Sequence, residues 1–84
     1  MMEELAFTMG GSRYRLNRKE VIEKLRGVQP GRIHAHAVSI EGVLFPVKEA
    51  FALATGADPL DFTTGKARRI LQILGFDVQR IVSA

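Results

Sequence analysis

The chain has no cysteine and no apolar run long enough to cross a membrane. Because cysteine is absent from all 84 residues, neither a disulfide framework nor a thiolate metal site can hold the fold together. A membrane-spanning helix needs roughly 18 apolar residues, and no stretch approaches that length. The first residues are acidic and lack the apolar segment of a secretory signal, so we expect a cytoplasmic protein with no membrane contact.

A large charge excess is also missing. Twelve Lys and Arg residues face nine Asp and Glu residues, which leaves a net charge of only +3. Any basic function must therefore come from local clustering of cations. The apolar share of 46% is enough for a packed core, and the short length predicts a single small domain that covers residues 1–84.

Residues 4–16 predict a β-hairpin with a two-residue turn at Gly10-Gly11, where positive φ angles are tolerated at both positions. This turn sets apolar residues opposite one another on one face of the hairpin. Arg13 and Arg15 then stand side by side on the solvent-facing side. They form a second basic strip if the hairpin lies beside the last helix, and otherwise they are an ordinary solvated strand face.

Residues 32–47 predict a second hairpin that turns at Glu41-Gly42. Its first strand carries apolar residues on both faces, which indicates a central strand and not an edge. His34 and His36 lie on the same side of that strand, a spacing that can bind zinc if a third ligand is present. Nothing in the sequence fixes a third ligand, so we predict no metal and no cofactor, with both histidines hydrogen-bonded in the strand or placed near a phosphate.

Helical spacing of apolar residues predicts three helices, at residues 18–26, 46–55 and about 65–74, followed by a short strand at 78–82. The predicted fold class is α+β, with an antiparallel sheet of two β-hairpins plus the C-terminal strand and about three helices on one face. The residues expected to be largely buried are Phe45, Phe51, Ile70, Leu71, Leu74 and Phe76.

The start of the last helix carries cations where acidic residues are usual. A helix N-terminus has a partial positive charge and free N–H groups, so Lys66, Arg68 and Arg69 destabilise it slightly unless an anion binds there. A nucleic-acid phosphate fits this requirement, and DNA is the expected partner. The predicted contacts are Lys66, Arg68, Arg69 and the backbone of Thr64 and Gly65, supported by Arg13 and Arg15.

No enzymatic motif is present, so we predict that the chain is not an enzyme. The Gly65-Lys66 pair is not a phosphate-binding P-loop, because alanine follows Lys66 and the required upstream glycine is missing. The alternative function is a protein-interaction or oligomerisation module, for example a homodimer, in which the basic residues only keep the surface soluble.

Several short segments of the C-terminal half resemble a small bacterial module. They are Phe45–Lys48, Ala54–Gly56, Asp61–Thr63, Ala67–Leu71 and Leu74–Phe76, and together they cover less than half of the chain. The module is similar to short uncharacterised bacterial proteins and to domains attached to restriction-type nucleases. The resemblance implies an accessory nucleic-acid contact without cleavage chemistry, and it assigns no functional residue.

Overall fold

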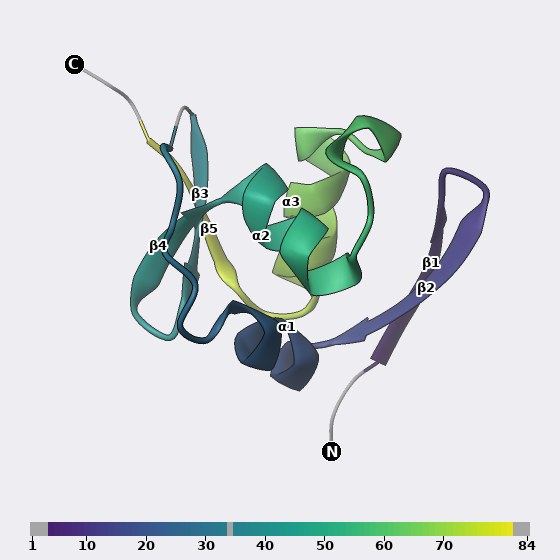
Figure 1. Cartoon of the computed structure of the whole chain (residues 1–84), viewed down its shortest axis with the longest axis horizontal. Helices are drawn as coiled ribbons and strands as arrows, with labels where there is room; N and C mark the ends of the chain where they lie inside the picture. The colour runs from purple at the N-terminus through teal and green to yellow at the C-terminus, as the bar shows by residue number, and fades with distance from the viewer. Residues whose placement is uncertain (1–3, 34, 82–84) are drawn as a thin grey trace.

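The computed structural model, which describes residues 4–33 and 35–81, alternates hairpins with helices (Figure 1). The strands are β1 (Glu4–Met9), β2 (Ser12–Asn17), β3 (His36–Ile40), β4 (Val43–Pro46) and β5 (Asp77–Arg80). The helices are α1 (Arg18–Leu25), α2 (Val47–Thr55) and α3 (Thr64–Ile73), and a single 3-10 turn, η1 (Pro59–Asp61), precedes α3. The predicted α+β class is confirmed.

The strands form two antiparallel sheets where the sequence predicted one. β1 and β2 make a two-stranded sheet, and β4, β3 and β5 make a three-stranded sheet with β3 in the centre, as its two apolar faces predicted. Figure 1 shows α2 and α3 between the two sheets, and not on one face of a single sheet. The reason is side-chain packing, because the ring of Phe7 in β1 packs against the ring of Phe51 in α2, with the ring centroids 5.8 Å apart.

Both hairpin turns form where the sequence predicts them. The turn residues all have positive φ angles, 54° and 81° at Gly10 and Gly11, and 51° and 79° at Glu41 and Gly42. This pattern belongs to the type I′ turn, whose twist matches that of the flanking strands. The resulting registers agree with the predicted apolar faces, which are confirmed by pairs such as Val38 with Phe45. Glu41 is a non-glycine residue in the left-handed region.

The helix boundaries follow local capping signals. Asn17 accepts a hydrogen bond from the N–H of Glu20 at 2.8 Å and so begins α1. α3 ends where the N–H of Phe76 donates to the carbonyl of Leu71 and Gly75 adopts a φ of 92°. This is the Schellman geometry that the Gly75-Phe76 pair predicted.

One apolar core connects the two sheets through the helices. All six residues predicted to be buried are buried, with Phe51 and Leu71 fully inaccessible to solvent. Phe51 also meets the ring of Phe62 edge-on, with the ring centroids 4.8 Å apart. The core therefore runs from the first hairpin, through α2, to α3 and the second sheet.

We expect Leu71→Ala to destabilise the protein by about 2–5 kcal/mol, because the lost side chain leaves a cavity that the packed surroundings cannot close. In a domain of this size each kcal/mol lowers the melting temperature by about 4–8 °C. Thermal unfolding measures the change, and Gln72→Ala, at the exposed neighbouring position of α3, is the control. Equal melting temperatures for both variants would contradict the core assignment.

Glu41→Asn should stabilise the protein by about 1 kcal/mol, because asparagine tolerates the left-handed conformation that Glu41 adopts. Chemical denaturation measures the gain. Glu41→Gln removes the same charge but keeps the unfavourable backbone conformation, so its stability should equal that of the wild type. A gain with glutamine as large as with asparagine would assign the effect to charge.

Candidate nucleic-acid interface

The start of α3 differs from the starts of the other two helices. α1 and α2 each carry an acidic residue in the first turn, Glu20 and Glu49, whereas α3 carries none. The Thr63 hydroxyl caps α3 by accepting from the N–H of Lys66 at 3.1 Å. The N–H groups of Thr64 and Gly65 have no place in the helical hydrogen-bond ladder and are available to an anion.

Lys66 connects the first hairpin to this helix start. Its Nζ donates to the carbonyl oxygen of Thr8 in β1 at 2.8 Å. Thr8 is paired with Arg13 across the hairpin, so Arg13 belongs to a strand pair that lies beside α3. Arg15 is farther along β2 and forms an ion pair with Glu4 at 3.7 Å between exposed side chains. Exposed pairs of this kind are weak, so Arg15 remains available to a stronger anion.

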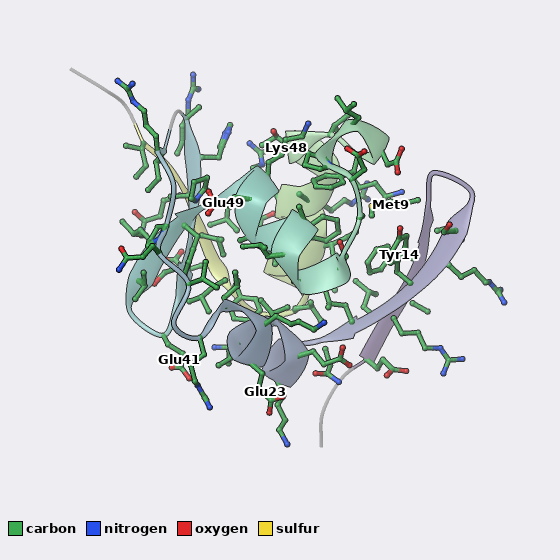
Figure 2. All side chains as sticks on the ribbon, in the orientation of Figure 1. Met9, Tyr14, Glu23, Glu41, Lys48 and Glu49 are labelled. Atoms are coloured by element: carbon green, nitrogen blue, oxygen red, sulfur yellow. The ribbon has the colours of Figure 1, made fainter. Side chains whose placement is uncertain are left out.

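Two residues that sequence reasoning did not select also lie at this end of α3. Lys48 places its Nζ 5.5 Å from the ring centroid of Phe62, which precedes the capping residue Thr63 (Figure 2). Asp61 carries a negative charge that opposes these cations. Its side chain packs against Gly10 at the tip of the first hairpin. The helix start is therefore cationic overall, with one carboxylate on the hairpin side.

Arg68 does not point the way that the sequence predicted. It was expected to be solvent-facing, but it is half-buried, and its Nη1 lies 2.7 Å from Nε2 of His36 in β3. The reason is helical spacing, which places Arg68 about 160° around the helix axis from Lys66. The exposed cations Lys66 and Arg69 therefore belong to one side of α3, and Arg68 belongs to another.

The Arg68 contact fixes the role of His36. An arginine side chain only donates hydrogen bonds, so in this contact His36 Nε2 is the acceptor. The Nε–H of Arg68 is buried and has no acceptor within the described residues. A buried donor without a partner costs about 1–3 kcal/mol, so Arg68 has unused hydrogen-bonding capacity.

Arg68 and His36 border a cavity of about 500 Å³ between α3 and the three-stranded sheet, called the His36 pocket below. Its lining residues are His36, Arg68, Gln72, Val78, Gln79 and Arg80. Sequence reasoning missed this pocket, because it depends on the pairing of β3 with β5, which brings His36 opposite Arg80. The alternating pattern of residues 78–82 predicted that Val78 and Arg80 share one face of a strand. It did not predict which strand that face would lie beside.

Within residues 4–33 and 35–81, no group of three or more potential metal ligands comes together. His34, the other histidine of the zinc hypothesis, lies outside the described residues. Among the helices that the structure describes, none is both long enough and apolar enough to span a bilayer.

Comparison with known proteins identifies the family of the chain. The family model described as SCO5918-like matches residues 9–84, which is most of the sequence, so the chain belongs to this family. No match was found among curated proteins, and none among solved structures. The description of the family carries no association with nucleases.

We expect Zn²⁺ to leave the melting temperature unchanged, because His36 Nε2 already accepts a hydrogen bond from Arg68. A metal that binds only the folded state would raise it. The measurement is thermal unfolding in excess ZnCl₂ and in excess chelator. A rise in zinc that disappears in His36→Gln would establish a metal site and contradict this expectation.

Proposed function

We propose that this member of the SCO5918-like family is a small nucleic-acid-binding module, with DNA as the partner, that holds phosphates at the start of α3. One observation carries the proposal. α3 alone among the three described α-helices begins without an acidic residue, and it presents exposed Lys66 and Arg69 in its first two turns. An anion at that position would complement both the helix dipole and the side chains.

The surroundings of α3 support a phosphate contact and not a reading of bases. Lys48 extends the cationic surface beside the helix start. Arg13 and Arg15 lie on the exposed face of the first hairpin, opposite to Phe7 and Tyr14, which pack against the core. Phosphate contacts set affinity and orientation but carry no sequence information. The segment between α2 and α3 also contains η1, so the arrangement is not a standard helix-turn-helix. We therefore propose binding that depends strongly on salt and weakly on sequence, and an accessory role beside a nuclease would fit it.

A protein-interaction or oligomerisation module is the second candidate. It is favoured by exposed apolar side chains, of which Leu60 is 90% exposed and Ile73 is 53% exposed. An apolar groove of about 570 Å³ also lies between the end of α1 and the β3–β4 turn, lined by residues such as Ile22 and Val43. Exposed apolar surface of this kind is typical of contacts with other proteins, including a second copy of the chain.

The double variant Lys66→Gln/Arg69→Gln should weaken binding to duplex DNA by a similar factor for unrelated sequences. Loss of two phosphate contacts should also lower the slope of log K against log salt by about two. Fluorescence anisotropy with labelled duplexes at several salt concentrations measures both effects. Stability should hold or rise, since cations leave the positive end of a helix dipole.

The matched control is Lys24→Gln/Arg26→Gln, which removes the same charge from exposed positions at the end of α1. It should leave the salt slope close to the wild-type value. Equal losses in both double variants would indicate general attraction to a cationic surface and contradict the α3 site. If wild type shows no salt-sensitive binding to DNA or RNA at micromolar concentration, the interaction module replaces this proposal, and sedimentation measurements then test for a dimer.

A further inference from the structure

We propose that the His36 pocket binds a phosphate group in its dianionic form. The site is separate from the start of α3, and the inference does not depend on nucleic-acid binding. It rests on three elements that meet in one cavity of about 500 Å³, which are α3, β3 and β5. A cavity of this volume is in the usual range for small-molecule sites.

The pocket gathers positive charge without a carboxylate to balance it. Arg68 enters from α3 and Arg80 from β5, and Arg80 stands opposite His36 in the register of β3 with β5. Within the described part of the chain, ion pairs join Arg15 to Glu4 and Lys19 to Glu23, so neither pocket arginine has a carboxylate within 4.0 Å. Among the described residues, the two guanidinium groups therefore have no anionic partner in this pocket.

The geometry of the sheet keeps the nearest acidic residue away from this face. Side chains alternate along a strand, so Asp77 leaves β5 on the side opposite to Val78 and Arg80 and does not line the pocket, whereas Gln79 borders it. Asp77 is also engaged by Gln79, whose Nε2 donates to its carboxylate at 3.0 Å. Val78 packs against the apolar core whereas Asp77 and Gln79 are exposed, so Val78 and Arg80 share the side of β5 that faces the helices.

Arg68 is held in place but left with spare donors. Its hydrogen bond to the imidazole of His36 positions the guanidinium without supplying a negative charge. Among the described residues, its Nε–H has no acceptor. Gln72 lies one turn farther along α3 on the same side as Arg68, so its amide can add a further donor.

These features favour phosphate over a carboxylate ligand. A carboxylate has one charge and two oxygens in a plane, and one arginine satisfies it in a bidentate contact. Two guanidinium groups on different elements need about two negative charges and oxygens that point in several directions. A phosphate monoester supplies a charge of about −1.5 to −2 and three acceptor oxygens at neutral pH, and inorganic phosphate supplies a substantial dianion fraction under the same conditions.

The test is an NMR titration of the wild-type protein with inorganic phosphate, against sodium chloride of equal ionic strength. Saturable shifts should appear at the amides around His36, Arg68 and Arg80, with a dissociation constant in the range of about 1 mM or tighter. Arg80→Gln should weaken binding by at least about fivefold, because one charge-assisted contact is lost. Arg26→Gln, an exposed arginine at the end of α1, should bind phosphate as the wild type does.

Arg80→Gln is the decisive variant because Arg80 is exposed and its loss does not disturb the core. Arg68 is half-buried, so phosphate binding by Arg68→Gln is interpreted only if the NMR spectrum of this variant remains that of a folded protein. No saturable shift up to ~50 mM phosphate, an equal response to chloride, or unchanged binding in Arg80→Gln would each overturn the proposal.

Two further arms identify the source of the phosphate. Thymidine monophosphate carries a dianionic monoester, whereas the dinucleotide dTpdT carries only an internal diester with a single charge. Binding of the monophosphate but not of dTpdT assigns the pocket to free phosphate or small phosphomonoesters. Equal binding of both would contradict the preference for a dianion and would assign the pocket to the nucleic-acid backbone. The start of α3 can also bind these probes, so the two sites are separated by where the shifts occur and by Arg80→Gln, which leaves Lys66 and Arg69 in place. Failure of the pocket is therefore distinct from failure of the α3 interface.

Discussion

The burial of α2 is the constraint on which the rest of the structure depends. The two sheets share no strand, so they are held together only by what packs between them. α2 contacts both sheets as well as α1 and α3, and its Phe51 is fully buried against Phe7 from the first hairpin and Phe62 from the segment before α3. Ala50 and Ala54, on the same helix, are small enough to let neighbouring backbones approach closely. Replacement of α2 by a polar helix would leave two hairpin sheets with no common core.

This arrangement also explains why the cations of α3 lie at two separate sites. α3 packs on α2 and lies between the hairpin and the three-stranded sheet, so its sides look toward different neighbours (Figure 1). Lys66 reaches the hairpin through the carbonyl of Thr8, and Arg68 reaches the other sheet through His36. Three cations that are close in the sequence are thus divided between an exposed helix start and an open pocket beside the three-stranded sheet.

Local signals in the sequence predicted most of the elements, and long-range relations limited the rest. The turns at Gly10-Gly11 and Glu41-Gly42, the Asn17 cap and the Gly75 helix end were all readable, because each depends on a few neighbouring residues. The division into two sheets was not readable, since alternating strands pack equally well against another strand or against a helix. The predicted orientation of Arg68 was wrong for a related reason. Its partner His36 lies on β3, and no local sequence pattern determines where β3 lies relative to α3.

The place of β5 in the sheet has a consequence for how the chain folds during synthesis. β1 with β2, and β3 with β4, are neighbours in sequence and can pair as soon as each hairpin leaves the ribosome. The second edge of β3 is completed by β5, which follows β4, α2 and α3 in the chain and is therefore made after both hairpins. Until β5 is made, the central strand has unpaired backbone groups on one side, which can pair with a strand of another nascent chain. Pairing of β5 with β3 therefore ends this period of exposure.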